Sequence, residues 1–140
     1  MTVATSSNNL YVNDHAARTE TAAALGRLLA DSYTLYLKTQ GFHWNVVGPR
    51  FEPLHSLFQE QYTELAAAID EIAERIRALG AKAPASFAEF ATLTSVDEEA
   101  GAPAAEVMLE SLLAGEESKC QEKYFDLTRH AVQPDHSSKL

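Results

Sequence analysis

The sequence predicts an all-α protein of the four-helix-bundle type. Apolar residues recur every three or four positions along two long segments, at about residues 15–46 and 52–80, and this is the period of one face of a helix. A third long segment, at about 103–128, has similar spacing, and no stretch has the alternation of a strand. A chain of 140 residues is expected to fold as one domain around a single core.

The first helix is expected to begin at about His15, after a polar and flexible arm over residues 1–14. Its inward face ends at His43, and the helix stops near Val46, because Gly48 is flexible and Pro49 cannot continue a helix. The residues that make up this face are Leu25, Leu29, Ser32, Tyr36, Thr39 and His43.

The second helix is expected to start at Glu52 and Pro53, since an acidic residue and a proline are both favoured in a first turn. It ends at Gly80, a typical residue just beyond a helix end, after a basic last turn. Its core face consists of Leu54, Phe58, Leu65, Ile69, Ile72, Ile76 and Leu79.

A short linker helix should follow, capped by Ser86 and presenting two phenylalanines and a leucine at positions 87, 90 and 93. The last helix should run from about Pro103 to about Thr128, which places the helical domain at 15–130 and a tail at 131–140. An antiparallel bundle has four helices. This chain supplies only three long ones.

The charge balance of the chain excludes some classes of function. The chain carries 11 Lys and Arg against 20 Asp and Glu, for a formal net charge of −9. Contact with nucleic-acid phosphates takes clustered basic side chains, so this balance argues against a generic nucleic-acid binder. An acidic balance suits a protein that handles cations, although such a charge also serves solubility alone.

Several sequence features indicate a cytoplasmic protein. Cys120 is the single cysteine and cannot form an internal disulfide, so no oxidising compartment is required. The apolar runs are far shorter than the roughly 20 residues that cross a bilayer. The N-terminus has no basic region followed by an apolar one, so no export signal is expected.

Histidines and carboxylates on the first two helices are candidate metal ligands. Asp70 and Glu74 are four residues apart, so their carboxylates share one helix face and can converge on a cation. His55 and Gln59 lie toward the same side of that helix, and His43 precedes them on the first helix. Each signal also has a structural interpretation, because exposed carboxylates are commonly solvated and an inward histidine is commonly a hydrogen-bonded core residue.

Spacing indicates how these residues could meet. Fifteen residues separate His55 from Asp70, which is roughly 22 Å along a helix, so one chain cannot close a site from all of them. Two copies packed antiparallel, crossing near residues 62–65, would place His55 of one beside Asp70 and Glu74 of the other. His43 can join the His55 of its own chain. Imidazoles and carboxylates with open positions suit a ferrous ion that meets an oxidant, with zinc or manganese as lesser candidates.

The chain resembles the Dps family, the ferritin-like mini-shells named as DNA-binding proteins from starved cells. The resemblance covers about residues 21–96 and is carried by LLADSYTLYLKTQGFHWNVVGPRFEPLH and AIDEIAERIRALG. It implies a ferroxidase centre between two subunits, with His43 and His55 from one chain and Asp70 and Glu74 from its neighbour. It also implies a hollow dodecamer built from two-fold dimers, which stores ferric iron inside and protects DNA. Such a shell oxidises ferrous iron, characteristically with hydrogen peroxide, and dioxygen is the other candidate oxidant.

The sequence departs from the family pattern at two places. Gln59 stands where members usually carry an acidic residue, and a neutral amide oxygen binds a cation less strongly than a carboxylate does. From about Gly115 the resemblance is lost, so a shortened chain with a missing or degenerate fourth helix is expected. Trp44 is expected to pack beside the site as a large core side chain whose indole N–H finds an acceptor.

Two other functions remain open at this stage. One is a nucleoid-associated protein that compacts DNA and has weak oxidase activity. The absence of Lys and Arg from residues 1–14 counts against direct DNA binding by the arm. The other is a truncated fragment that forms a dimer and stores no iron, because a missing helix would leave an apolar face uncovered.

Overall fold

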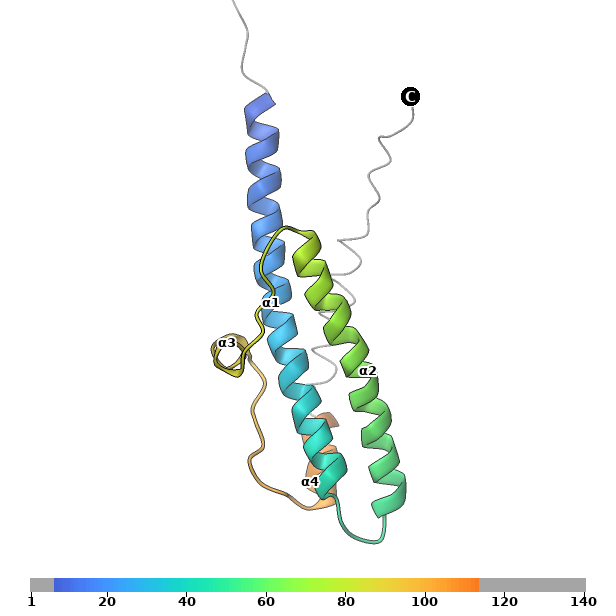
Figure 1. Cartoon of the computed structure of the whole chain (residues 1–140). Coiled ribbons are helices and arrows are strands. Elements are labelled where there is room, and N and C mark those ends of the chain that lie inside the picture. Colours follow the sequence, from blue (N-terminus) through green and yellow to red (C-terminus); the bar gives the residue numbers. More distant parts are fainter. Residues whose placement is uncertain (1–6, 114–140) are drawn as a thin grey trace, which may run out of the picture.

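A computed structural model describes residues 7–113 of the chain, and this part is all helical, as predicted. No strand occurs within that range. None of its helices is long and apolar enough to cross a membrane. The helices are α1 (Ser7–Asn45), α2 (Phe51–Ala78), α3 (Phe87–Leu93) and α4 (Ala105–Leu113) (Figure 1).

Helix α1 begins at Ser7, earlier than the predicted start at about His15. The prediction relied on apolar periodicity, and every residue from Asp14 to Glu20 is exposed, so this part of the helix has no buried face to mark it. Local contacts hold it instead. The Arg18 guanidinium lies 3.0 Å from the Asp14 carboxylate, one turn away.

Helices α1 and α2 form an antiparallel hairpin, and both of its predicted boundaries are confirmed. The α1 helix ends at Asn45, and Gly48 turns the chain with a φ of 113°, a value that favours glycine. The α2 helix begins at Phe51 and ends at Ala78. Gly80 follows with a φ of 85°, and its N–H donates to the carbonyl oxygen of Arg77, which closes the end of the helix.

The faces predicted for α1 and α2 meet along the hairpin and bury two clusters. The first lies near the α1–α2 turn and the second near the other end of α2. In the first are Leu35, Phe42, Val46, Leu54, Phe58, Val96, Met108 and Leu112. In the second are Leu25, Leu28, Leu29, Ala30, Ile72, Ile76 and Phe90. Both ends of α2 therefore rest on well-buried apolar side chains.

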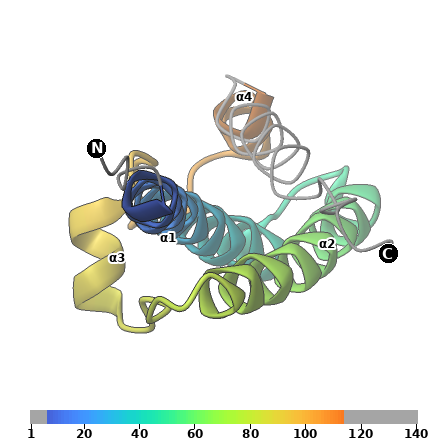
Figure 2. The ribbon, with the colours of Figure 1, turned by 90° about the horizontal axis from the view of Figure 1, so that it is seen from above.

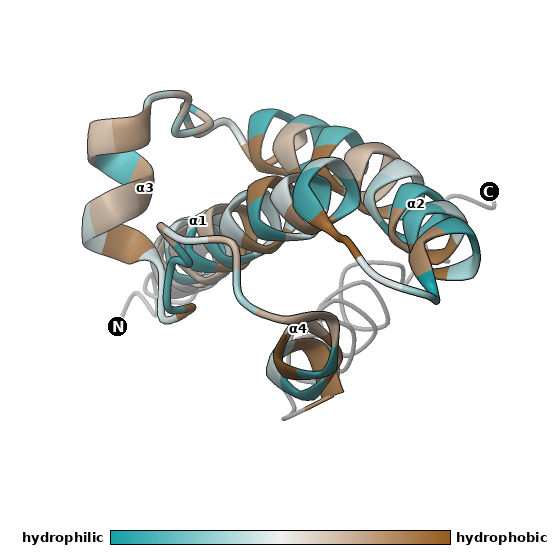
Figure 3. Cartoon of the chain, turned by 90° about the horizontal axis from the view of Figure 1, so that it is seen from below, coloured by the Kyte–Doolittle hydropathy of each residue, from teal (hydrophilic) through white to brown (hydrophobic). Residues whose placement is uncertain are grey.

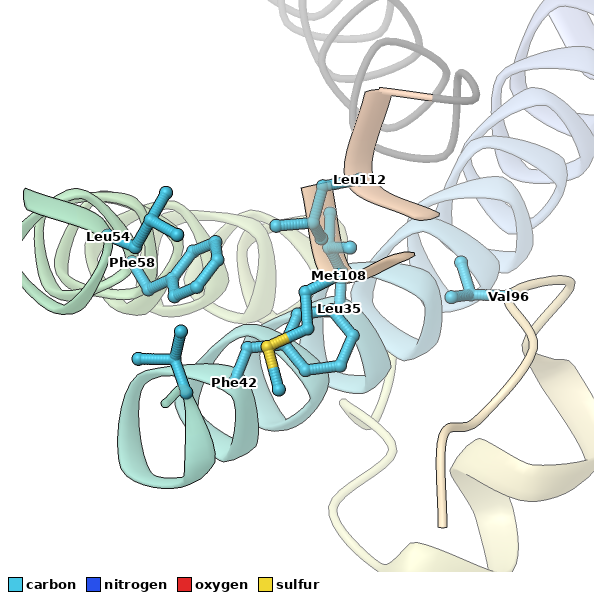
Figure 4. Close-up of a cluster of buried hydrophobic side chains, with 8 residues drawn as sticks. Leu35, Phe42, Leu54, Phe58, Val96, Met108 and Leu112 are labelled. Atoms are coloured by element: carbon cyan, nitrogen blue, oxygen red, sulfur yellow. The ribbon is translucent and has the colours of Figure 1, made fainter. Parts of the chain in front are cut away.

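Helix α4 covers the first cluster. Met108 and Leu112 point from α4 toward side chains of α1 and α2 (Figure 4). At the turn, the Arg50 guanidinium lies 3.1 Å from the Glu106 carboxylate. The ribbon of α4 has the colour of hydrophobic residues along much of its length (Figure 3). Viewed from above, α3 and α4 lie on different sides of the α1–α2 pair (Figure 2).

Helix α4 begins at Ala105, close to the predicted start at Pro103, and is described as far as Leu113. The remainder of the predicted last helix, including Cys120, lies outside the described residues. The same holds for the predicted tail and for the expectation of a missing or degenerate fourth helix.

The predicted cap of the linker helix is confirmed. The Ser86 Oγ accepts a hydrogen bond from the N–H of Glu89 at 3.2 Å, and the Glu89 carboxylate accepts from the N–H of Ala85 at 2.9 Å, so the two side chains cap the helix reciprocally. Lys82 donates to the same carboxylate at 2.8 Å. Hydrogen bonds from Lys82, Ala85 and Ser86 lower the pKa of Glu89 from 4.5 to about 2.

A buried carboxylate ties the segment after α3 to α1. Asp31 is 2% exposed, and its carboxylate accepts from the hydroxyl of Thr94 at 2.9 Å and from the N–H of Ser95 at 2.6 Å. The Ser95 hydroxyl lies 3.1 Å from the second carboxylate oxygen. These bonds offset the cost of burying the charge and fix the path of the chain beyond α3.

Candidate metal centre

The two predicted histidines come together across the α1–α2 hairpin. The rings of His43 and His55 stack with centroids 3.7 Å apart and planes inclined by 17°. The Nδ1 of His43 lies 2.6 Å from the carbonyl oxygen of His55, and the Nδ1 of His55 lies 2.8 Å from the carbonyl oxygen of His43. The predicted closeness of the two side chains is confirmed.

This reciprocal pairing decides which ring nitrogen can bind a metal. A carbonyl oxygen only accepts, so the Nδ1 of His43 and that of His55 must each carry a proton and donate it. In a neutral imidazole the Nε2 then holds a lone pair. Hydrogen bonding of the other ring nitrogen to a carbonyl is the usual support of a metal-binding histidine. The pair thus presents two oriented Nε2 donors.

Local structure explains the pairing. His43 lies in the last turn of α1, where backbone carbonyls have no partner within the helix. His55 lies in the second turn of α2, directly across the hairpin, and a carbonyl oxygen with two lone pairs can accept from a ring as well as from its helix. His43 is only 7% exposed, so this end of the site is embedded in the chain.

Aromatic rings that were not among the predicted site residues surround the pair. Phe51 stacks on His55 with centroids 4.9 Å apart, and Tyr62 meets His43 edge-on at 5.2 Å. Helical spacing carried a signal for both, because Phe51 is one turn before His55 and Tyr62 is two turns after it on α2. These rings limit the movement of the two imidazoles.

Trp44 is not the core side chain that was predicted. It is 61% exposed in this chain, although it follows the buried His43 directly. Consecutive residues on a helix point about 100° apart, so the two side chains leave α1 in different directions. Trp44 instead lines a pocket of about 390 Å³ together with Leu37, Phe87 and Phe90.

The predicted carboxylates lie far from the histidines in the same chain. Asp70 and Glu74 are exposed and one turn apart near the end of α2, and neither makes a hydrogen bond or ion pair with the described part of the chain. Gln59 is exposed one turn after His55. Fifteen residues of continuous helix, about 22 Å, separate His55 from Asp70.

One chain therefore holds the candidate ligands as two separate halves. Within residues 14–113, no group of three or more His, Cys, Asp and Glu side chains is placed to hold a metal ion. The histidine half offers neutral nitrogen donors, and the carboxylate half offers anionic oxygen donors. Together they make a mixed set that suits iron, with zinc and manganese as further possibilities.

Comparison with known proteins identifies the class. Residues 22–138 match the family model of the ferritin-like domain, so the chain belongs to the ferritin-like proteins. Within that class it belongs to the Dps family. The crystal structure of a Dps protein from Vibrio cholerae is 31% identical, with a TM-score of 0.74 over 84% of this chain and 75% of that one. Dps from Staphylococcus aureus is 33% identical, with a TM-score of 0.71 over 81% and 77%.

A curated relative adds to this. The DNA protection during starvation protein 2 of Bacillus anthracis is 45% identical over 89 residues, which cover 64% of this chain. The chain spans 61% of the length of that relative in the match. The match to this relative is confined to 89 residues, whereas the model of the ferritin-like domain extends to residue 138.

Proposed function

We propose that this protein oxidises ferrous iron with hydrogen peroxide at a site shared between two copies of the chain. The ferric product is stored inside a closed shell of subunits in the cytoplasm. Iron is the substrate of the reaction and becomes the stored cargo. Removing ferrous iron and peroxide together removes the reagents that make hydroxyl radicals, so DNA is protected without a need for direct contact.

The observation that carries the proposal is the reciprocal histidine pair. A pair of core histidines with a purely structural role has no need for both Nδ1 atoms to be held on carbonyls while both Nε2 atoms stay free of protein partners. Among the residues that the structure describes, His43 and His55 have this arrangement, with each Nδ1 2.6–2.8 Å from a carbonyl oxygen. It sets both rings in the tautomer that binds a cation.

The arrangement of α2 supports a shared site. Antiparallel packing of two α2 helices, crossing near residues 62–65, brings the histidine half of one copy to the carboxylate half of the other. Ala66 is exposed beside this crossing, so another helix can approach closely there. A two-fold axis then makes two identical sites from two incomplete chains.

Each residue has a defined role in this site. His43 and His55 donate nitrogen lone pairs, while Asp70 and Glu74 of the other copy supply negative charge that favours the ferric product. Gln59 can add a weaker carbonyl oxygen. Two ferrous ions give one electron each to hydrogen peroxide, which takes up two protons and breaks its O–O bond to form two water molecules.

The names of the relatives support the same function. The Vibrio cholerae structure is described as a member of the ferritin-like diiron-carboxylate proteins. The Bacillus anthracis protein is named for DNA protection during starvation. We expect a particle of about twelve chains by light scattering, because a shell with point-group symmetry closes only at a fixed number of subunits.

Mixed assemblies test the shared site. One variant carries His43→Ala and His55→Ala, the other Asp70→Ala and Glu74→Ala, and the two are co-expressed with different tags. Each mixed dimer has one intact site and one doubly altered site, so about a quarter of the wild-type peroxide-dependent oxidation should return when subunits pair at random. The control pairs the histidine variant with Glu64→Ala, an exposed residue away from the ligand face.

Each double variant alone should show only background oxidation, and two other results would contradict the proposal. If the mixed assembly oxidises no more iron than either parent, the site is not shared between copies. If the histidine variant alone retains full activity, the pair is not the iron site.

A further inference from the structure

A continuous series of aromatic rings leads away from the histidine pair. Tyr62 lies edge-on to His43 at 5.2 Å and edge-on to Tyr36 at 5.9 Å, measured between ring centroids. Tyr36 lies 5.7 Å from Tyr33, which stacks on Phe90 at 4.9 Å. Each of these separations is a contact distance for aromatic rings. Three phenols therefore connect the candidate iron site to the far side of α1.

The environment of these phenols suits transient oxidation. All three tyrosines are half-buried, so their rings are shielded without being sealed in the core. Gln40 donates its side-chain N–H to the hydroxyl oxygen of Tyr36 at 3.3 Å, which leaves the hydroxyl proton of Tyr36 free to move. Tyr33 lines the pocket of about 390 Å³ that also contains Trp44, so the series ends at an accessible cavity.

We propose that Tyr62 is an electron donor to the iron site and that Tyr36 and Tyr33 carry the resulting radical away from it. This inference rests on the proposed function, because peroxide and ferrous iron must meet at His43 and His55. Such a donor is needed whenever a site holds a single ferrous ion. Gln59 favours that state, because its neutral amide oxygen binds a cation less strongly than a carboxylate does.

The reaction balances with one iron and one phenol. Hydrogen peroxide takes one electron from a ferrous ion and one from Tyr62. It also takes two protons, one from the Tyr62 hydroxyl and one from solvent. Its O–O bond breaks, and the products are a ferric ion, a Tyr62 phenoxyl radical and two water molecules. Without the phenol, a single ferrous ion delivers only one electron, and peroxide splits into hydroxide and a hydroxyl radical.

The radical then moves by exchange of an electron and a proton between neighbouring phenols. Tyr36 loses its hydroxyl hydrogen as Tyr62 regains one, and the same exchange follows between Tyr36 and Tyr33. A purely structural interpretation treats the three rings as packing between α1, α2 and α3. Replacing Tyr62 by phenylalanine keeps the ring and removes the oxidisable hydroxyl, so it separates these two roles.

The experiment mixes purified full-length protein with one ferrous ion per chain and an equal amount of peroxide, followed by rapid freezing and electron paramagnetic resonance. Wild type should give a tyrosyl signal, and Tyr62→Phe should reduce it to background while hydroxyl-radical spin adducts rise. Phe87→Leu is the matched control, since it alters an exposed ring that packs against Tyr33, away from the two histidines, and removes no phenol. It should keep the signal.

A nitroso spin trap with mass spectrometry follows the path. Adducts should appear on Tyr33 in wild type and shift to Tyr62 in Tyr36→Phe. Persistence of the tyrosyl signal in folded Tyr62→Phe would overturn the proposal. Oxidation of iron by wild type without any tyrosyl signal would also overturn it while leaving the proposed function intact. A wild-type protein that oxidises no iron removes both.

Discussion

At the start of α2, His55 lies between Phe51 and His43 and donates its Nδ1 proton to a backbone carbonyl. Near the end of α2, Asp70 and Glu74 are exposed and have no partner in the described part of the chain. Both ends rest on buried apolar clusters of the same hairpin. The two ends of α2 therefore differ in how their polar side chains are held, and not in the apolar core beneath them. Histidine donors are oriented within one chain, and the carboxylates are left for a second copy to orient.

The largest expected effect concerns the cores under the two ends. Phe58→Ala should lower the free energy of unfolding by about 3–5 kcal/mol, and Ile76→Ala by about 2–5 kcal/mol, because each leaves a cavity. Both side chains are at most 1% exposed. Urea denaturation followed by circular dichroism measures both, with the exposed Ser56→Ala as control. A loss below about 1 kcal/mol for Ile76→Ala would mean that the carboxylate end is less well packed than its burial indicates.

The next largest effect compares a polar side chain from the histidine end with one from the carboxylate end. His43→Ala should lower the free energy of unfolding by about 1–3 kcal/mol, since it removes the hydrogen bond from the His43 Nδ1 to the carbonyl oxygen of His55 and the ring that stacks on His55. Asp70→Ala should change it by no more than about 0.5 kcal/mol, as for an exposed side chain. The same denaturation experiment in metal-free buffer measures both. Equal losses for the two variants would contradict the contrast between the two ends.

Helix α3 supports the second cluster through Phe90, so its cap tests how the carboxylate end is held. Ser86→Ala should cost about 1 kcal/mol, because the N–H of Glu89 loses its capping oxygen. Ser86→Thr is the matched variant that keeps a hydroxyl, and it should recover most of the loss. Amide hydrogen exchange in α3 should rise in Ser86→Ala before it rises in α1 or α2. Uniform exchange across all three helices would show that α3 does not open on its own.

Glu89 offers a smaller, pH-dependent test on the same helix. Its pKa is about 2 in the folded chain and 4.5 in the reference state, so the cap contribution is present above pH 4.5 and is lost as the pH falls toward 2. The effect is modest because the side chain is exposed to solvent. The chemical shift of the Ala85 amide, which donates to this carboxylate, should titrate with a midpoint near 2. A midpoint near 4.5 would exclude the cap geometry.

The sequence predicted the structure best at positions where the residue type favours one local conformation or one environment. Gly80 with its left-handed φ, Ser86 as a cap and the apolar face of α2 were all predicted and confirmed. The approach of His43 to His55 was also predicted from helix periodicity and a short turn. Their roles as iron ligands, and those of Asp70, Glu74 and Gln59, stay predictions.

Other features left no usable signal in the sequence. The reciprocal bonds of His43 and His55 end on backbone carbonyls, which every residue carries, so only the hairpin geometry reveals them. The exposure of Trp44 depends on which way α1 is rotated at its last turn. Helix α1 begins at Ser7, and its described residues from Asp14 to Glu20 are all exposed, so periodicity has no buried face to detect there.

The Asp31 contact has a consequence for the order of folding. The two histidines are 12 residues apart, whereas Asp31 and Ser95 are 64 apart, so closing the second loop costs more chain entropy. Short-range contacts tend to form first. Ser95→Ala should therefore speed unfolding and leave the refolding rate nearly unchanged in stopped-flow measurements, and a matching fall in the refolding rate would refute this order. In the expected order, the Asp31 hydrogen bonds form after the hairpin has folded. The rate at which these bonds break would then set how long the segment after α3 stays bound to α1.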